Sequence, residues 1–430
     1  MKTFQIINLG CPKNLTDAEE ISYNLKKAGY DISNDRKTEI AVINTCAFLK
    51  SAIKESKDVI REFIKLKKEK KIKKIIVSGC LVERIKEKLL LEFPEIDNII
   101  GINSISKIKE ALQNKKADKS YILPEDNSIS SHNRLRLTVR HSAYIKIADG
   151  CNNNCSYCAI PQIRGRLRSK PIEQILSETD ALADSGAIEI SLIAQDTTSY
   201  GLDLYKKPML KSLLKKLVLN KKIKWLRLMY MYPDRIDAEL LKIIRDNDVI
   251  CHYMEMPIQH ISDNILKKMN RTSDEKTIRN KIELIKKIIP DMALRTSFIV
   301  GFPTENEKDF NKLINFVEET KFNNLAIFKY SREYSTKAYS IEKQIPYREK
   351  NLRYKYLLKT QSRILDKINL NLIDKKLDVL IDYGNIGRTY MDAPEIDGKV
   401  YIKNASPKSG NIIKAKIIAA QGYNREAVKM

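Results

Sequence analysis

The stretch Asp149-Gly-Cys-Asn-Asn-Asn-Cys-Ser-Tyr-Cys-Ala-Ile-Pro161 determines how this chain is interpreted. It places thiols at Cys151, Cys155 and Cys158, and its Gly, Asn and Pro residues predict a loop. A structural zinc site needs four ligands, but no further Cys or His follows Cys158 until Cys251. Iron-sulfur clusters are held by closely spaced thiolates, and three thiolates leave one iron of a cubane cluster with an open position. The stretch therefore predicts a cluster with one iron available for chemistry.

The spacing Cys-x3-Cys-x2-Cys, with Tyr157 before the last Cys, resembles the signature of the radical S-adenosylmethionine enzymes. The resemblance implies that the open iron binds S-adenosylmethionine and gives one electron to its sulfonium. Cleavage of the C–S bond then yields a 5'-deoxyadenosyl radical, which takes hydrogen from an unactivated carbon. The cofactor carries this chemistry, and the protein positions it and excludes water and oxygen. The alternatives are an incomplete zinc knuckle or three buried apolar Cys residues.

Length and composition set broad limits on the protein. A chain of 430 residues predicts two or three domains. The net charge of +24 indicates contact with a polyanion such as ribosomal RNA, although a Lys- and Ile-rich genome composition would explain it equally well. No run of 18 apolar residues occurs, and the first apolar run is too short for a signal peptide, so we expect a cytoplasmic protein with no membrane partner. In that reducing compartment the seven Cys are better interpreted as metal ligands than as disulfides.

The first part of the chain alternates short apolar runs with longer amphipathic ones. Strands are predicted at residues 4–9, 40–43 and 74–78, with helices at about 17–28 and 49–68, which indicates an α/β, doubly wound parallel sheet. Each strand is followed by a Cys, namely Cys11, Cys46 and Cys80. Because the carboxyl ends of parallel strands share one edge, we expect these thiols to converge and to hold a second cluster. The alternative is three unrelated buried Cys.

Three stretches around these thiols resemble the amino-terminal domain of the methylthiotransferases. They are Gly10-Cys-Pro-Lys-Asn14, Asn44-Thr-Cys-Ala-Phe48 and Ser78-Gly-Cys-Leu81. The resemblance implies a transferase that inserts sulfur and caps it with a methyl group. It also implies two 4Fe-4S clusters and S-adenosylmethionine, with the amino-terminal cluster delivering the sulfur, and an electron donor such as flavodoxin or ferredoxin.

Six strand-like runs at fairly regular intervals follow a polar linker. They lie at residues 143–147, 189–193, 225–230, 253–256, 294–300 and 325–328, and they predict a partial (β/α)6 barrel. The active site is expected at the carboxyl ends of these strands. Polar candidates there are Gln195, Asp196, residues 232–235, Gln259, His260 and residues 301–305. The superfamily resemblance implies that Gln195, Gln259 and Gly301 bind S-adenosylmethionine.

The predicted domain limits are residues 1–118 for the methylthiotransferase domain, 119–136 for the linker, 137–366 for the radical core and 367–430 for the tail. His132 and His141 are expected to face solvent, and Cys251 to be a buried apolar residue. Arg164 and Arg166, just past the cluster loop, fit either surface positions or contacts to cofactor or substrate.

The tail contains short alternating runs at residues 377–381, 399–402 and 412–418, which predict a small antiparallel β-barrel. In the methylthiotransferases this position holds a TRAM domain that grips the macromolecular substrate. Residues 421–430 depart from the acidic and aromatic ending that the family resemblance leads us to expect.

Two branches of the family differ in substrate, an adenosine of transfer RNA or an aspartate of ribosomal protein S-twelve. The ribosomal branch is favoured by the resemblance of residues 10–14, 194–201, 257–262 and 387–398. Residues 257–262 and 387–398 are expected to touch the substrate, which would be S-twelve either free, within the ribosome or in an assembly intermediate. A rival from another class is a basic ribosome- or RNA-binding factor with structural zinc.

We predict that anaerobic reconstitution loads about eight irons per chain, because two sets of three thiols would hold two cubane clusters. Replacing Cys151, Cys155 and Cys158 with Ala should halve the iron and abolish cleavage of S-adenosylmethionine. Iron analysis and product chromatography measure both effects. A colourless, zinc-containing protein, or full iron content in the triple variant, would contradict the assignment.

Overall fold

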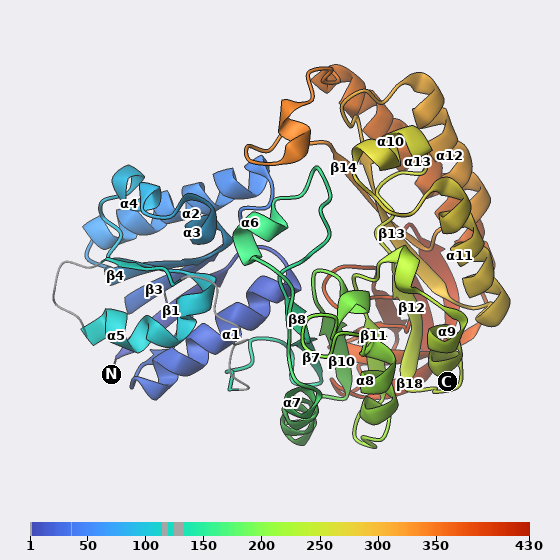
Figure 1. Cartoon of the computed structure of the whole chain (residues 1–430). Coiled ribbons are helices and arrows are strands. Elements are labelled where there is room, and N and C mark those ends of the chain that lie inside the picture. Colours follow the sequence, from blue (N-terminus) through green and yellow to red (C-terminus); the bar gives the residue numbers. More distant parts are fainter. Residues whose placement is uncertain (1, 36, 114–118, 124–132) are drawn as a thin grey trace. The chain divides into compact units, whose positions relative to one another are not determined.

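The computed structural model describes residues 2–35, 37–113, 119–123 and 133–430 (Figure 1). The chain forms two compact units. The first unit comprises residues 1–137, 146–153 and 158–174, and the second comprises residues 138–145, 154–157 and 175–430. Half of the predicted linker, residues 124–132 with His132 among them, lies outside the described residues. The predicted domain limits therefore stay predictions.

The first unit contains a six-stranded parallel sheet in the order β2-β1-β3-β4-β5-β6. Helices α1 and α5 lie on one face, and α2, α3 and α4 on the other (Figure 1), so the predicted doubly wound sheet is confirmed. Apolar residues of β3 and β4 fill a core on each face. The strands are β1 (Thr3–Asn8), β2 (Asp31–Ile32), β3 (Thr38–Thr45), β4 (Ile72–Gly79), β5 (Asn98–Ile100) and β6 (Ser120–Tyr121), and the helices are α1 (Pro12–Lys27), α2 (Lys50–Lys68), α3 (Cys80–Ile85), α4 (Lys88–Glu92) and α5 (Ile108–Gln113).

Helix α1 begins at Pro12, about five residues before the predicted start. Cys11 is the extended N-cap residue, and Pro12 occupies the first turn, where its fixed φ suits a helix and its missing N–H is not needed. The sequence did not predict this start, because the first turns contain the polar residues Asn14 and Asp17 where an amphipathic pattern has apolar ones. Both side chains are buried in the structure. The early start places both side chains beside the end of the sheet that carries the thiols.

The second unit is organised around a sheet in the order β14-β13-β12-β11-β10-β7, with parallel pairing from β10 to β14. Helices α9, α11, α12 and α13 cover one side of it (Figure 1), and the predicted partial barrel is confirmed. The strands are β7 (Ser142–Lys146), β10 (Glu189–Ile193), β11 (Trp225–Leu228), β12 (Ile250–Glu255), β13 (Ala293–Val300) and β14 (Asn324–Lys329). The helices are α7 (Ile172–Asp184), α8 (Leu210–Leu217), α9 (Ala238–Arg245), α10 (Asp263–Lys268), α11 (Glu275–Ile288), α12 (Glu307–Thr320) and α13 (Tyr347–Leu370).

The tail folds into a closed five-stranded barrel in the order β15-β16-β17-β19-β18. The predicted barrel is confirmed, and its pairs are antiparallel except for β17 and β19, which pair in parallel. Its interior is filled by small and β-branched residues such as Val379, Ile402 and Ala427. The unusual ending of the chain supplies β19, which pairs with both β17 and β18 and closes the barrel. The departure in sequence therefore leaves the barrel intact. The strands are β15 (Lys376–Tyr383), β16 (Ile386–Arg388), β17 (Val400–Lys403), β18 (Ile412–Gln421) and β19 (Asn424–Lys429).

The connection between β16 and β17 covers the amino ends of the core strands. Arg388 donates a hydrogen bond of 2.8 Å to Glu189, the first residue of β10. The Tyr253 hydroxyl donates to Asp397 at 2.9 Å, and Asp397 also pairs with Arg295 near the start of β13. This edge is opposite to the one where the active site was expected.

The prediction that residues 387–398 touch the substrate is wrong for most of the stretch, because residues 387–389, 391–394 and 398 are buried. Deleting the tail would expose these contacts, so it would test the stability of the core as well as substrate binding. The prediction for His141 is also wrong. Its side chain is buried, and Nε2 lies 3.0 Å from Asp382, which also accepts hydrogen bonds from Arg388.

Replacing Arg388 with Met should lower the stability of the second unit by about 3–5 kcal/mol, because breaking a buried ion pair leaves an uncompensated charge. Burial opposes the ionisation of Glu189, but Arg388 and Arg227 hold its pKa below the usual value. The midpoint of urea unfolding, followed by circular dichroism, measures the loss. The matched control is Lys414→Met, which removes an exposed pair with Asp378 and should change stability by about 0–1 kcal/mol. Equal midpoints for the two variants would contradict the buried contact.

Candidate functional site

The first thiol set consists of Cys11, Cys46 and Cys80. Cys11 follows β1 as the N-cap of α1, Cys46 directly follows β3, and Cys80 is the first residue of α3 after β4. Strands β1, β3 and β4 are neighbours in a parallel sheet, so all three thiols lie at one edge, as expected. Cys80 is buried, and the other two are partly exposed.

The surroundings of the first thiol set fit a cluster. Gly10 has a φ of +103°, and a Cβ there would lie 2.9 Å from Cys46 Cβ and 3.1 Å from its sulfur. Burial, with smaller contributions from Cys11 and Cys46, raises the pKa of the Cys80 thiol to about 12, although Arg164 acts in the opposite direction. A coordinating metal deprotonates such a thiol outright. The described residues hold no ready-made group of three or more ligands for a single ion, and a cubane cluster differs in that each thiolate binds its own iron.

Helix α6 (Ile160–Arg164), just past the cysteine loop, packs within the first unit. Ala159 and Ile163 belong to the same apolar core as Cys80, Leu81 and Val82. The loop residue Cys158 is the immediate chain neighbour of Ala159. The polypeptide that carries the last cysteine of the loop is therefore held against the helix that begins at Cys80.

Four buried charges stabilise this arrangement. Arg164 donates to Asp149 at 2.9 Å and to Asp17 at 2.7 Å. Lys146 donates to the same two carboxylates, at 3.0 and 2.5 Å. Burial disfavours ionised Asp149, but Arg164 and Lys146 hold its pKa well below the usual value. Of the two alternatives for Arg164, the surface position is wrong, because its side chain is buried and donates to Asp17 of α1.

The second thiol set consists of Cys151, Cys155 and Cys158. In the first unit, the N–H of Asn153 donates to Cys151 sulfur at 3.4 Å, and the N–H of Ile160 donates to Cys158 sulfur at 3.5 Å. Such donors stabilise a thiolate and tune the potential of a cluster bound to it. The donor pattern fits an iron-sulfur loop.

Cys155 groups with the second unit, where Arg271 lies beside it. Arg271 Nη1 is 3.7 Å from the Cys155 sulfur, and Nη2 donates to the carbonyl of Pro257 at 2.8 Å. The guanidinium also stands 4.0 Å above the ring of Tyr232, which is a close cation-π contact. Sequence analysis missed Arg271, because nothing in the local pattern around it indicates a contact with a residue more than a hundred positions earlier.

The three residues predicted to bind S-adenosylmethionine follow strands of the second unit. Gln195 comes after β10, Gln259 after β12 and Gly301 after β13, so they share one edge of the sheet. Gln259 and Gly301 both have a positive φ, of +74° and +70°. A Cβ on Gly301 would lie 2.3 Å from Lys350 Cγ, so the backbone turn needs glycine. Their role as cofactor contacts stays a prediction.

A buried polar chain supports the turn at Gly301. Glu305 accepts hydrogen bonds from the N–H groups of Gly301 and Phe302 at 2.8 and 3.3 Å, and Arg353 donates to its other oxygen at 2.5 Å. His260 is fully buried, with Nε2 3.6 Å from Glu305. Because it is buried, His260 does not face a macromolecular substrate, contrary to the expectation for residues 257–262.

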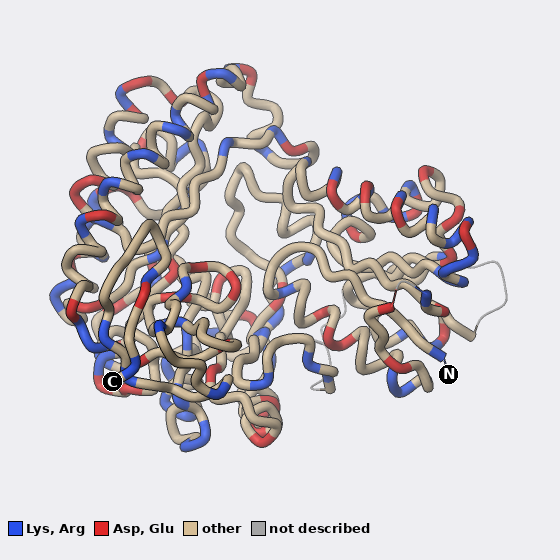
Figure 2. Tube along the Cα trace, turned by 180° about the vertical axis from the view of Figure 1, so that it is seen from behind, with Lys and Arg blue, Asp and Glu red and all other residues tan. Residues whose placement is uncertain are grey.

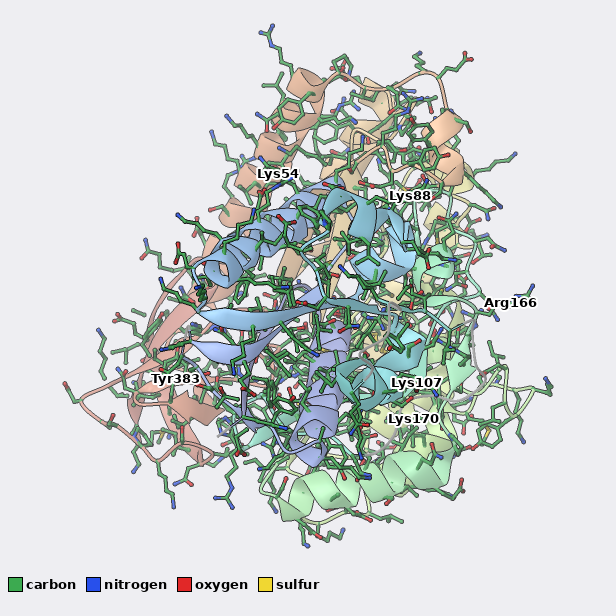
Figure 3. All side chains as sticks on the ribbon, turned by 90° about the vertical axis from the view of Figure 1, so that its left-hand side faces the viewer. Lys54, Lys88, Lys107, Arg166, Lys170 and Tyr383 are labelled. Carbon is green, nitrogen blue, oxygen red and sulfur yellow. The ribbon has the colours of Figure 1, made fainter. Side chains whose placement is uncertain are left out.

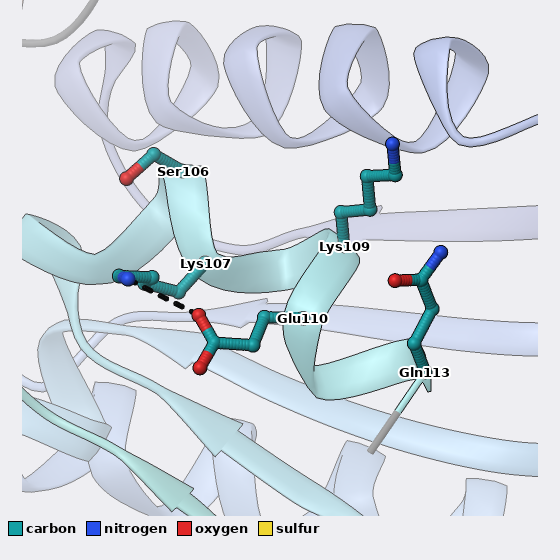
Figure 4. A pocket seen from close by; sticks show the side chains of 5 residues that line it. All are labelled: Ser106, Lys107, Lys109, Glu110 and Gln113. Atoms are coloured by element: carbon teal, nitrogen blue, oxygen red, sulfur yellow. Dashed lines mark ion pairs between the residues drawn. The ribbon is translucent and has the colours of Figure 1, made fainter.

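Asp196 and Arg235 have structural partners. Asp196 caps the turn at residues 197–199, accepts from Ser199 Oγ at 2.6 Å and pairs with Arg235 at 3.1 Å. Beside this pair lies a hollow of about 260 Å³ lined by Thr198, Pro208, Leu210, Lys211, Asp234, Arg235, Asp237 and Leu240. Another hollow, on η1 (Ile102–Lys107) and α5, contains no thiol and is crossed by a 3.1 Å ion pair between Lys107 and Glu110 (Figure 4). Neither hollow shows the chemistry of the thiol sets.

Cys251 is buried, as expected, but it is not in a purely apolar environment. Burial raises the pKa of its thiol to about 11, against the opposing field of Arg227.

Among the described residues no helix is long and apolar enough to cross a membrane. Basic and acidic residues alternate along the outer helices (Figure 2), so the positive charge is spread over the surface.

Comparison with known proteins assigns the class. Residues 145–317 match the model of the Radical SAM superfamily, residues 3–101 match uncharacterized protein family UPF0004, and residues 372–428 match the TRAM domain. The fold resembles a radical S-adenosylmethionine methyltransferase, TsrM, from Kitasatospora setae, with a TM-score of 0.59, 14% identity and coverage of 79% of this chain and 74% of that one. The chain is a radical S-adenosylmethionine enzyme.

Full-length relatives narrow the class to one family. The chain is 46% identical over 421 residues to ribosomal protein uS12 methylthiotransferase RimO of Elusimicrobium minutum, covering 97% of both chains. The protein of the same name from Thermoanaerobacter is 43% identical, with 99% of both chains covered. This chain belongs to the RimO family of methylthiotransferases. S-adenosylmethionine and 4Fe-4S clusters are the cofactors of this chemistry, so the cofactor prediction is confirmed at the level of the family.

Replacing Gly150 with Ala should disrupt the cysteine loop and remove about half of the iron, one of two cubane clusters. Gly150 has a φ of +75°, and a Cβ there would lie 2.0 Å from the carbonyl oxygen of Arg166, which belongs to the backbone and cannot swing aside. Iron and sulfide analysis after reconstitution measures the loss.

The matched control is Gly29→Ala. Gly29 has a φ of +88° but no atom within 4 Å of the added Cβ, so it carries the conformational strain without the clash. Full iron content in both variants would show that the close approach at Gly150 does not shape the loop.

Proposed function

We propose that this protein adds a methylthio group to the β-carbon of an aspartate in ribosomal protein uS12. The proposal is supported by full-length similarity to relatives that carry this name and by the three matched domains. The sequence features of the ribosomal branch agree with it. An enzyme that modifies an adenosine of transfer RNA is not favoured.

The two thiol sets have different proposed roles. Cys151, Cys155 and Cys158 would hold the cluster that supplies the electron for cleavage of S-adenosylmethionine, and the first thiol set would hold the cluster that supplies sulfur. The observation that carries this division is the geometry of the first thiol set, three thiols at the carboxyl ends of adjacent parallel strands. When bound, the clusters and S-adenosylmethionine supply electron transfer, radical formation and sulfur, and the protein supplies binding and orientation.

Gln195, Gln259 and Gly301 are the proposed contacts of S-adenosylmethionine in the second unit. Their common place past the carboxyl ends of β10, β12 and β13 supports this role, since ligands of such sheets bind at that edge. Glu305 stabilises the Gly301 turn by accepting a hydrogen bond from the Gly301 N–H, and Arg353 donates to the other oxygen of Glu305. The substrate carbon must be held close to the same edge, because a radical takes hydrogen from whatever carbon is nearest.

The tail barrel is the proposed contact for ribosomal RNA next to uS12. Exposed lysines occur on its strands, for example Lys403, Lys414 and Lys416, and cationic side chains bind the phosphate backbone without reading sequence. An electron donor such as flavodoxin or ferredoxin is part of the proposal. We place the reaction in the cytoplasm, where ribosomes are assembled.

Mass spectrometry of uS12 and of digested transfer RNA tests the substrate. Cells with this protein should carry a 3-methylthio group on one uS12 aspartate, and cells without it should lose the group. Loss of a methylthio group from an adenosine, with uS12 unchanged, would instead identify a transfer-RNA enzyme.

A variant with Cys11, Cys46 and Cys80 all replaced by Ala separates the two chemistries. Without the sulfur-supplying cluster it should still form 5'-deoxyadenosine from S-adenosylmethionine, but uS12 should gain no sulfur. Methylthiolated uS12 at the normal rate in this variant would refute the division of roles.

A further inference from the structure

Arg164 is the residue whose position the family chemistry does not account for. It lies six residues after Cys158, yet its side chain is only 1% exposed and is directed at the first thiol set. Its Nη2 atom lies 3.7 Å from the sulfur of Cys80 and donates to Asn14 Oδ1 at 2.7 Å. One guanidinium nitrogen therefore faces a cluster-binding sulfur and its neighbouring amide oxygen together.

If Cys80 binds iron, its sulfur depends more on the hydrogen-bond donor at Arg164 Nη2 than the free thiol does. The free thiol lies 3.4 Å from Asn14 Oδ1 and can donate its proton to that oxygen. A thiolate bound to iron has no proton to donate, so two acceptors would then face each other in a buried place. Arg164 Nη2 carries two N–H groups, and because Asp17 accepts one of them, the other is the donor that Asn14 Oδ1 and the Cys80 sulfur would share.

Asn14 cannot turn away to relieve this contact. It is fully buried, and its amide nitrogen donates to the carbonyls of Leu9 and Thr45, each at 2.9 Å. Leu9 directly follows β1 and Thr45 is the last residue of β3, so these carbonyls lie just before Cys11 and Cys46 in the chain. The amide oxygen is thus fixed on the side of Cys80, and only a donor beside it can satisfy both acceptors.

The ion pairs of Arg164 with Asp149 and Asp17 orient its guanidinium so that Nη2 faces the Cys80 sulfur. Lys146 supports both carboxylates, and the N–H of Gly150 donates to Asp149 at 3.0 Å, so neither carboxylate depends on Arg164 alone. The two acids hold the guanidinium plane from two sides, at Nη1 and at Nη2. Its orientation is fixed before any cluster is bound.

We propose that Arg164 is a positioning residue for the first cluster: it donates a hydrogen bond to the Cys80 thiolate and raises the reduction potential of the cluster held there. Hydrogen bonds to sulfur and nearby positive charge both favour the reduced, more negative cluster. The inference rests on the proposed cluster at the first thiol set. It adds that a residue from the S-adenosylmethionine loop tunes the sulfur-supplying centre.

The test uses the full chain with Cys151, Cys155 and Cys158 replaced by Ala, so that only the first cluster gives a signal. Reductive titration followed by electron paramagnetic resonance should show a more negative midpoint potential for Arg164→Gln, with a smaller shift for Arg164→Lys. An unchanged potential in both variants, at equal iron content, would overturn the proposal.

Two control variants separate this role from general support of the fold. Lys146→Met removes a cation of the same buried network that donates to Asp17 and Asp149 rather than to Cys80. A shift as large as that of Arg164→Gln would overturn the proposal. Arg166→Gln changes an arginine two residues away whose side chain is exposed and extends from the ribbon (Figure 3), and it should leave the potential unchanged.

A measurement without substitution at Arg164 covers the case in which its variants fail to bind iron. Protein labelled with ¹⁵N in its arginine side chains should show a nitrogen coupling to the reduced first cluster in pulsed electron paramagnetic resonance. No coupling would overturn the proposal. A protein with no iron and no signal in the first set would instead refute the proposed function, so the two failures are distinguishable.

Discussion

Two buried carboxylates paired with two buried cations are the constraint on which the first unit depends. Asp17 lies on the helix that begins at Cys11, and Asp149 lies two residues before Cys151. Arg164 and Lys146 bridge them with bonds of 2.5 to 3.0 Å. The two positive and two negative charges balance, so removing any one of them would leave one opposite charge uncompensated. In a low-dielectric interior an uncompensated charge costs several kcal/mol. The network therefore fixes the start of α1 against both ends of the cysteine loop.

This constraint has a chemical consequence within the first unit. A cluster is held well only if its thiolates are placed before it binds, and a cluster's potential depends on the donors around its sulfurs. Here the donors come from two sources, since backbone N–H groups serve Cys151 and Cys158 while an arginine side chain serves Cys80. In the second unit, Arg271 takes the corresponding place beside Cys155. Each thiol set thus has one arginine within 3.7 Å of a sulfur.

The two edges of the sheet in the second unit have different roles. The carboxyl ends of the strands carry the candidate contacts of S-adenosylmethionine, with positive φ at Gln259 and Gly301. The amino ends are covered by the connection of the tail barrel, through Arg388 and Asp397. A stretch that resembles one substrate branch therefore has a structural role at the edge remote from the chemistry.

The sequence by itself determined the six thiols, the parallel strands before three of them and the three-part order of the chain, because spacing and hydrophobic period are local properties. It could not determine where polar residues far apart in the chain would meet. His141 was predicted to face solvent, and Arg164 to be a surface or contact residue, yet tertiary packing buries both. Only the folded chain brings Arg164 to Cys80 and Arg388 to Glu189, since each pair joins residues separated by more than eighty positions. A buried charge is stable only beside a partner, and that partner is chosen by the fold.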